Sequence, residues 1–281
     1  MPYNAEIRRG NPSCFLFLID QSGSMADAWG GEAGKKKSEG LATIINNFLQ
    51  GLVLVCSNDP VDFRPKNYFS VGVLGYGAKL GPAFSGNLAG KDLATIIEIA
   101  EMPARIEEKT RKVEDGAGGL VNQSVKFPVW FESVANGGTP MCGAFSKAES
   151  ILSGWVASHR DSFPPVVINV TDGESTDGDP MLAAESLKKL ATNDGNLLLL
   201  NVHLSSQKSE PIMFPESENS LVDEYAKLLF KMSSPLTEGM KGRARATGIK
   251  VGDGSTGFVF NADPVSVIQL LEIGTRWDNL R

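Results

Sequence analysis

Short stretches rich in large apolar residues alternate along this chain with longer stretches in which apolar residues recur at helical spacing. A short apolar stretch bounded by turn residues is typical of a strand, and one without charges is typical of a strand buried on both faces of a parallel sheet. The pattern predicts six strands, at residues 14–19, 68–76, 125–131, 166–171, 196–204 and 257–260. Pro128 cannot donate a backbone hydrogen bond, so we expect the third of these strands at an edge of the sheet.

Apolar residues spaced three and four positions apart predict amphipathic helices between the strands. The most regular helical pattern runs from Leu41 to Leu52, and Ser38 in front of it is expected to be the N-cap. Further helices are predicted at residues 93–100, 140–155, 180–190, 221–232 and 263–274. Because strands and helices alternate, the expected fold is α/β: a doubly wound, mostly parallel six-stranded sheet flanked by helices, with one antiparallel edge strand.

The length of 281 residues allows one large domain that carries insertions. We expect a single domain over residues 13–275, with terminal tails at 1–12 and 276–281. Two segments depart from the alternation of strands and helices and are interpreted as insertions, at about 77–124 and 205–255. The first of them is expected to carry surface features rather than core residues.

Composition and charge argue against several classes of function. A net charge of -6 argues against non-specific nucleic-acid binding, which requires a basic surface. The cysteines Cys14, Cys56 and Cys142 and the histidines His159 and His203 lack the spacing of a zinc site or of a Cys–His nucleophile pair. No apolar stretch looks long enough to span a bilayer. We therefore expect a cytoplasmic protein with reduced thiols and no membrane partner.

The candidate chemistry begins where the first predicted strand ends. Asp20 closes this apolar run and is followed by Ser22 and Ser24, with Gly23 between them to let the loop fold back. Open α/β sheets place their ligand sites at the carboxyl ends of strands. One carboxylate and two hydroxyls are hard oxygen donors, and they suit Mg²⁺, Mn²⁺ or Ca²⁺ rather than a soft metal.

Two later residues extend this donor set. Thr139 lies on a loop that leads into a predicted helix, and Asp172 follows the apolar run at 166–171 just as Asp20 follows the first run. Two aspartates at the ends of different parallel strands can face one crevice. Because neutral hydroxyls leave more residual charge on a metal than carboxylates do, an open coordination position would attract a carboxylate from another molecule.

Three segments together resemble the metal-ion-dependent adhesion site of von Willebrand factor A (VWA) domains. They are Asp20-Gln21-Ser22-Gly23-Ser24, Gly138-Thr139-Pro140 and Thr171-Asp172-Gly173, and they occur in the order of that family. The resemblance implies a Rossmann-like sheet over about residues 13–275. It also implies that Ser22, Ser24 and Thr139 ligate the metal by their hydroxyls, while Asp20 and Asp172 hold it directly or through water.

The chain is longer than a typical VWA domain and is most similar to stand-alone cytosolic bacterial VWA proteins of the tellurite-resistance Y type. Members of that group are associated with a protein kinase and a metal-dependent phosphatase encoded nearby. The resemblance therefore implies a non-enzymatic adaptor or scaffold that binds an Asp or Glu side chain of a protein partner through Mg²⁺. It further implies a role in a bacterial signalling, stress or defence system under phosphorylation control.

Two other functions remain open from the residues alone. Asp20 could be the nucleophile of a Mg²⁺-dependent phosphotransferase or hydrolase, as strand-end aspartates are in other folds. Such sites generally need a second carboxylate two residues further on as the general acid, and Ser22 stands at that position. The third function is a purely structural domain whose site holds no metal.

Several residues also allow simpler interpretations. Asp20 and Thr139 are residue types that satisfy loop and helix-end amides without any metal. Trp29 is expected either to pack inside the protein or to anchor a partner from an exposed position. Lys35–Lys37 are expected to be a solvated loop end rather than an anion site. A solvated surface is likewise expected of the acidic residues after the second strand-end aspartate: Glu174, Asp177 and Asp179. Asp179 is also expected to cap the helix predicted at 180–190.

Overall fold

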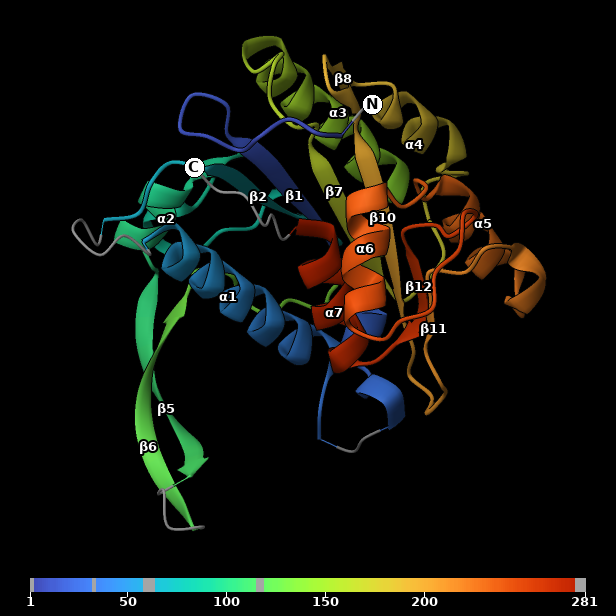
Figure 1. Ribbon diagram of the computed structural model, residues 1–281. Coiled ribbons are helices and arrows are strands. Elements are labelled where there is room, and N and C mark those ends of the chain that lie inside the picture. The colour runs from blue at the N-terminus through green and yellow to red at the C-terminus, as the bar shows by residue number, and fades with distance from the viewer. Residues whose placement is uncertain (1–2, 32–33, 58–63, 115–118, 276–281) are drawn as a thin grey trace.

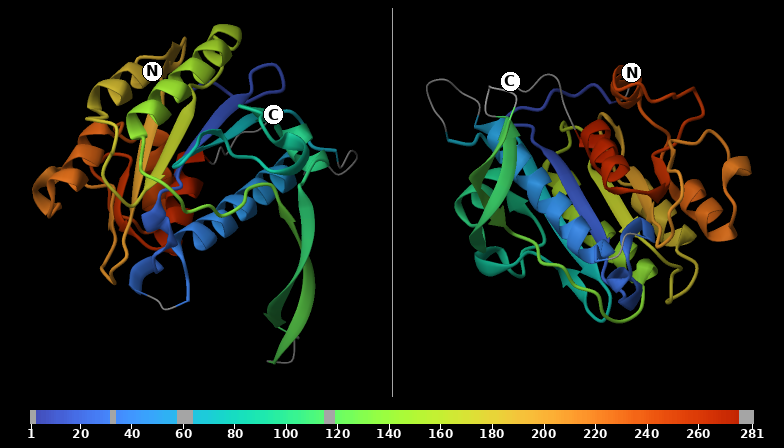
Figure 2. Two further views of the ribbon diagram at one scale, coloured as in Figure 1. Left: turned by 180° about the vertical axis from the view of Figure 1, so that it is seen from behind. Right: turned by 90° about the horizontal axis from the view of Figure 1, so that it is seen from below.

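The computed structural model describes residues 3–31, 34–57, 64–114 and 119–275. Within them, helices cover both faces of a central sheet (Figure 1). A two-stranded ribbon extends away from this body, as Figure 1 and the left view of Figure 2 show. The α/β class expected from the sequence is therefore confirmed.

In the described part of the chain, the central sheet has eight strands in the order β11-β12-β10-β7-β1-β2-β3, with β4 paired to β2. The long inner strands run parallel: β1 (Ser13–Asp20), β2 (Phe69–Tyr76), β7 (Val166–Thr171), β10 (Leu198–Leu204) and β12 (Phe258–Ala262). Short strands pair antiparallel at the sides: β3 (Leu80–Pro82), β4 (Ala94–Thr95) and β11 (Ile212–Met213). The sheet exceeds the predicted six strands because strands of two or three residues have no detectable periodicity.

The helices divide between the two faces of the sheet. One face packs against α1 (Lys37–Cys56), α2 (Ile96–Glu101), α6 (Glu238–Ala246) and α7 (Pro264–Thr275). The other face packs against α3 (Met141–Ser158), α4 (Met181–Lys188) and α5 (Glu224–Met232). Smaller elements are the strands β8 (Ala191–Thr192) and β9 (Gly195–Asn196) and the 3-10 turns at Gly23–Ala26, Trp29–Gly31, Gly86–Leu88 and Glu218–Ser220.

Strand β1 shows why an unbroken apolar run is needed at the centre of this sheet. Its side chains point alternately to the two faces. Phe15 and Phe17 belong to the core under α1, while Leu16 and Leu18 belong to the core under α3. All four are fully buried, so a polar residue at any of these positions would lie in a core. The uncharged run that predicted a doubly covered strand is therefore explained by the helices on both faces.

Helix α1 begins two residues earlier than predicted. Its N-cap residue is Lys36, which makes no side-chain capping hydrogen bond, and Ser38 lies inside the first turn. The helix has 20 residues and a mean hydropathy of 1.3 in its most apolar window, so by length and composition alone it could cross a membrane. We had expected no such stretch. In the structure Leu41, Ile45 and Leu49 of this helix pack into the core on one face of the sheet.

The strand predicted at 125–131 does not join the central sheet. Residues Leu120–Val129 form β6, which pairs antiparallel with β5 (Arg105–Glu114) in the separate ribbon. Pro128 does lie in a strand with an unpaired edge, but the edge belongs to the ribbon. The base of the ribbon is fixed by Asn46 of α1, which accepts hydrogen bonds from the backbone N–H groups of Trp130 (2.8 Å) and Phe131 (3.1 Å).

Part of the segment 77–124 belongs to the core, contrary to expectation. Phe84, Leu88, Ile96 and Ile99 are at most 4% exposed and pack with α1 and β2. The later segment 205–255 contributes core residues as well, through Leu236, Met240 and Ala244 around helix α6. Phe84 and Leu88 stand among small and polar residues, so the local pattern does not reveal their burial. Ile96 with Ile99, and likewise Leu236 with Met240 and Ala244, have helical spacing, which was the available signal.

Candidate metal centre

The two strand-end aspartates lie at the same edge of the sheet. Strands β1 and β7 are parallel neighbours, and Ile19 is in register with Val170. Asp20 therefore ends β1 beside Thr171, and Asp172 follows immediately. Strand β1 has β2 on its other side, so chain connections leave to both sides at this point, as at the ligand-binding crevice of open α/β sheets.

The loop after β1 folds back so that both serines face the aspartates. The backbone N–H of Ser22 donates to Asp20 Oδ1 at 2.8 Å. Ser22 Oγ lies 3.0 Å from Ser24 Oγ, and Ser24 Oγ donates to Asp172 Oδ1 at 2.7 Å. The two serines thus connect the ends of strands β1 and β7 through a continuous series of polar contacts.

Thr139 reaches the same place from the loop before α3. That loop is tied to the β1 loop by a hydrogen bond from Gly23 N–H to Gly137 O, at 2.9 Å. A Cβ built on Gly173 would lie 4.0 Å from both Ser24 Oγ and Thr139 Oγ1, so these two hydroxyls face one spot. The structure therefore brings together all five residues that the sequence proposed as ligands.

Burial and hydrogen bonding act in opposite directions on Asp20. Its side chain is fully buried, and this desolvation raises the pKa of the carboxyl above its usual value. Hydrogen bonds from Ser22 and Thr171 act to lower the pKa, and the nearby charge of Asp172 adds to the rise. Thr171 Oγ1 donates to Asp20 Oδ2 at 2.7 Å and accepts from the Tyr225 hydroxyl at 3.2 Å. Both oxygens of Asp20 are thus held in place.

Lys37 is a site residue that sequence reasoning missed. Its ammonium Nζ lies 2.5 Å from Asp172 Oδ2 and donates to Ser206 Oγ at 2.7 Å. The Lys37 side chain is 2% exposed, so the expectation of a solvated loop end is wrong for this lysine. A signal was present in the helical spacing: Lys37 precedes Leu41 by four residues and Ile44 by seven, which places it on the buried face of α1.

The donor set fits a hard divalent cation. With metal–oxygen distances of about 2.0–2.1 Å, adjacent ligand oxygens of an octahedral Mg²⁺ site lie roughly 3 Å apart. The Ser22–Ser24 and Ser24–Asp172 oxygen pairs have spacings of this size, at 3.0 and 2.7 Å. In the described residues there is no group of three or more His, Cys, Asp or Glu side chains that could hold a metal. A metal here would therefore depend on the hydroxyls of serine and threonine.

A buried polar network supports the site from inside the sheet. The Tyr76 hydroxyl donates to Asn169 Oδ1 at 2.6 Å, and Asn169 Nδ2 donates to Asn201 Oδ1 at 2.9 Å. Asn201 Nδ2 in turn donates to Ser233 Oγ at 2.9 Å. The network links β2, β7 and β10 to the end of α5. Polar residues inside apolar strand patterns were the available signal, but they do not reveal which partners they meet.

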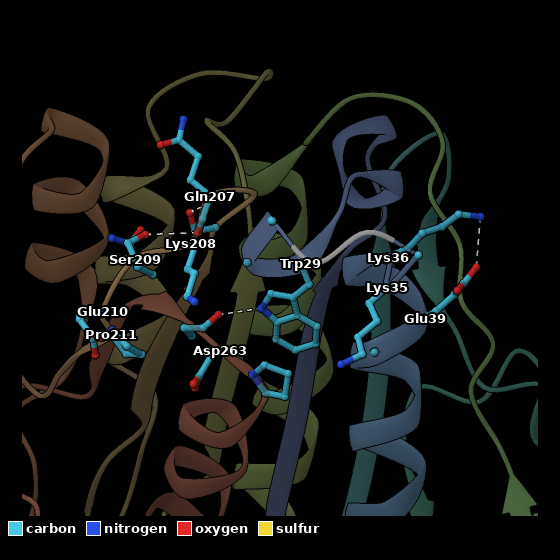
Figure 3. A pocket seen from close by; sticks show the side chains of 18 of the residues that line it. Trp29, Lys35, Lys36, Glu39, Gln207, Lys208, Ser209, Glu210, Pro211 and Asp263 are labelled. Atoms are coloured by element: carbon cyan, nitrogen blue, oxygen red, sulfur yellow. Dashed lines mark hydrogen bonds and ion pairs between the residues drawn. The ribbon is translucent and has the colours of Figure 1, made fainter.

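Trp29 packs inside the protein rather than anchoring a partner. It is 4% exposed, and its indole N–H donates to Ala262 O at 2.8 Å. Its ring forms one wall of a cavity of about 1000 Å³ between the β1–α1 loop and the loop after β10 (Figure 3). Lys35 and Lys36 line this cavity, with Lys36 paired to Glu39 at 3.1 Å. The third of these consecutive lysines, Lys37, instead pairs with Asp172.

Two of the acidic residues after Asp172 are helix caps. Asp177 accepts hydrogen bonds from the N–H groups of Cys142 (3.0 Å) and Gly143 (2.9 Å) at the start of α3. Asp179 accepts from Met181 N–H at 2.9 Å and so caps α4. Both contacts are typical of carboxylates at helix N-termini. These two residues therefore hold the helices that flank the site. The role of Asp179 was expected from the sequence, whereas that of Asp177 was not.

No model of a known protein family matches this chain, and a comparison with curated proteins also gives no match. Among solved structures, similarity is found to the vWF domain of the type V pili tip protein Mfa5 from Porphyromonas gingivalis. The TM-score is 0.30 at 13% identity, over 59% of this chain and 39% of that chain.

Two further solved structures show a similar level of likeness. For proximal thread matrix protein 1 from the mussel byssus, the TM-score is 0.35 at 13% identity, over 70% of this chain and 37% of that chain. For the pilus adhesin RrgA from Streptococcus pneumoniae, the TM-score is 0.29 at 14% identity, over 59% of this chain and 21% of that chain. This chain thus spans less than half of each of them. Scores of this size carry no argument for function, so the conclusions below rest on the geometry of the site.

Proposed function

We propose that this protein is a non-enzymatic adaptor or scaffold that binds a protein partner through a divalent metal, with Mg²⁺ first and Mn²⁺ or Ca²⁺ as alternatives. The observation that carries the proposal is the gathering of two carboxylates and three hydroxyls at one edge of the sheet. Contacts of 2.7–3.0 Å link Asp20, Ser22, Ser24 and Asp172, and the Thr139 hydroxyl faces the same spot as that of Ser24. A metal bound there would supply positive charge for an Asp or Glu side chain of the partner.

The residues divide into a buried and an accessible part. Asp20, Ser22 and Thr139 are at most 4% exposed and would hold the metal from the side of the protein interior. Asp172 also has a buried side chain, whereas Ser24 is exposed. The accessible side of the site is therefore next to Ser24, and we propose that the partner carboxylate approaches there.

An enzyme that uses Asp20 as nucleophile is less well supported. Asp20 Oδ1 accepts from Ser22 N–H and Oδ2 accepts from Thr171 Oγ1, so both oxygens are engaged inside the protein. A nucleophile needs an oxygen aligned with its substrate. A phosphatase assay in Mg²⁺ would decide between the two functions, since turnover that is lost in Asp20→Asn would support the enzyme.

The biological setting rests on the motif resemblance alone. We propose a cytoplasmic bacterial protein whose partner is a kinase or a phosphatase, and whose binding is under phosphorylation control. Neither nucleic acid nor a membrane is part of this proposal. Identification of the proteins that are captured in Mg²⁺ and released by EDTA would test the setting directly.

Metal binding itself is tested by isothermal titration with Mg²⁺ and Mn²⁺. We expect a one-site isotherm for the wild type and its loss in Asp20→Ala, because the buried carboxylate is then absent. Asp92→Ala is the matched control, since Asp92 is an exposed aspartate paired with Lys147 at 3.7 Å, away from the metal centre. If the wild type gives no binding heat with either metal, the proposal fails.

A further inference from the structure

The ion pair between Lys37 and Asp172 lies inside the candidate metal centre. Asp172 uses its two oxygens differently: Oδ1 accepts from Ser24, and Oδ2 accepts from the Lys37 ammonium at 2.5 Å. The side chains of Lys37 and Asp172 are 2% and 0% exposed. Lysines are rarely buried unless they are paired with an acid. The structure therefore contains a positive charge of its own at the proposed metal centre.

The fold fixes Lys37 in this position from two sides. The lysine opens helix α1, and its backbone N–H donates to Asp27 O at 3.1 Å, which ties it to the loop that carries the serines. Its ammonium also donates to Ser206, which follows strand β10 on the far side of β7. Lys37 thus bridges the β1 loop and the end of β10 across Asp172.

The charges explain why a lysine belongs there without a metal. Asp20 and Asp172 are near enough for each charge to disfavour the other, and both side chains are buried. Burying a carboxylate without a compensating cation is strongly unfavourable. A divalent metal that uses Asp172 would provide this compensation itself, but its charge would repel the ammonium at short range. The lysine and the metal therefore compete for one carboxylate.

We propose that Lys37 is an internal cation that closes the site and sets its metal affinity by competing for Asp172. At low metal concentration, Lys37 holds Asp172 and the site is closed. At high metal concentration, Asp172 turns to the metal and Lys37 leaves the pair. This inference rests on the proposed function and adds its regulation: partner binding would follow the free metal concentration.

The test compares Mn²⁺ affinities, measured by titration calorimetry and by electron paramagnetic resonance of free Mn²⁺. Lys37→Met keeps the length and apolar stem of the side chain but removes its charge, so we expect at least tenfold tighter Mn²⁺ binding. Lys36→Met is the matched control, because Lys36 is exposed and paired with Glu39, and its affinity should stay within twofold of the wild type. Equal or weaker binding in Lys37→Met would overturn the inference.

A second, milder variant tests the same competition in case Lys37→Met does not fold. Without its partner Asp172 would be a buried unpaired charge, so Lys37→Met could unfold in the absence of metal. Ser206→Ala removes one hydrogen bond from the ammonium and leaves the charge in place. We expect twofold to fivefold tighter Mn²⁺ binding in this milder variant, and unchanged affinity would count against the inference.

Amine labelling gives an independent readout on the wild-type protein. If Asp172 releases Lys37 when metal binds, an amine-reactive ester should modify Lys37 faster in Mn²⁺ than in EDTA, as measured by peptide mass spectrometry. The exposed Lys36 should react at the same rate in both conditions. Absence of Mn²⁺ binding in the wild type and in Lys37→Met would defeat the proposed function as well. Binding that is equally tight in both would defeat only the competition.

Discussion

At the scale of single residues, the half-buried histidine near the candidate metal centre makes stability depend on pH. His203 stacks on Phe260 with ring centroids 4.9 Å apart, and its burial lowers its pKa to about 4. In an unfolded chain the imidazole titrates near about 6.5. Below that pH the unfolded state therefore binds more protons than the folded state. As a result, the free energy of unfolding decreases as the pH is lowered.

We expect this residue alone to remove roughly 3 kcal/mol of stability between about pH 6.5 and about pH 4. The measurement is the urea midpoint of the wild type and of His203→Gln across that range. The variant should lose less stability on acidification than the wild type, because its side chain does not titrate. Parallel pH profiles for the two proteins would contradict the lowered pKa of His203 in the folded state.

A second residue-scale prediction concerns Asn46 of α1. Its side chain accepts from Trp130 N–H and Phe131 N–H, and it donates to Phe131 O at 2.8 Å. Truncation to alanine would leave these buried backbone groups without partners, at a cost of about 1–3 kcal/mol for each unsatisfied group. We therefore expect Asn46→Ala to lower the free energy of unfolding by roughly 2–4 kcal/mol in chemical denaturation. Asn47→Ala, at an exposed position of the same helix turn, should change it by less than about 0.5 kcal/mol.

Residues of the site differ in how far the sequence predicts them. Asp20 and Asp172 could be predicted because each follows an uncharged strand pattern, and strand ends meet at one edge of a parallel sheet. Lys37 could not be distinguished from Lys35 and Lys36 by composition. Its burial depends on where α1 starts relative to Asp172, and the structure places that start two residues before the predicted one. Partners across a sheet, such as Asn169 with Asn201, depend on strand register, which the sequence pattern does not fix.

At the scale of elements, the β5–β6 ribbon extends away from the rest of the molecule (Figure 1). Its strands pair with each other from Arg105 opposite Val129 outward, and α1 contacts its base. The strand at 125–131 was predicted in the wrong sheet because its partner, β5, was not recognised. The charged run after Arg105 has polar residues on both faces and therefore lacks the apolar alternation of a half-buried strand. A strand solvated on both faces can be found only through its partner.

This isolation predicts that the ribbon can be shortened. In the variant, Asn-Gly replaces residues 110–124 and joins Lys109 to Val125, which face each other across the ribbon. A two-residue Asn-Gly turn matches the twist of paired antiparallel strands. Because the buried residues Val129 and Trp130 remain, we expect a melting temperature within about 3 °C of the wild type. A decrease of more than about 10 °C would mean that the outer ribbon contributes to the core.

At the scale of the whole molecule, the fold was predictable because the alternation of apolar strands and helices is repeated along the chain. Each inner strand is mostly apolar on both faces, and each is followed by chain that returns along one face of the sheet, so the alternation itself indicates a doubly wound sheet. The segment 77–124 was expected at the surface because Phe84 and Leu88 stand among small and polar residues. Their burial follows from packing against α1 and β2, which only the assembled molecule provides.

The candidate metal centre also couples the molecule as a whole, because its donors come from three distant parts of the chain: the β1 loop, the loop before α3 and the end of β7. A ligand that binds only when these parts are assembled stabilises the folded state by RT ln(1 + [L]/Kd), about 2.7 kcal/mol at a hundredfold excess over Kd. For a domain of this size we expect the melting temperature to rise by roughly 5–10 °C at that metal concentration. The rise should follow Mn²⁺ or Mg²⁺, disappear with EDTA and be absent in Asp20→Asn. Asp92→Ala should show the same rise as the wild type, because the variant leaves all three parts of the site in place.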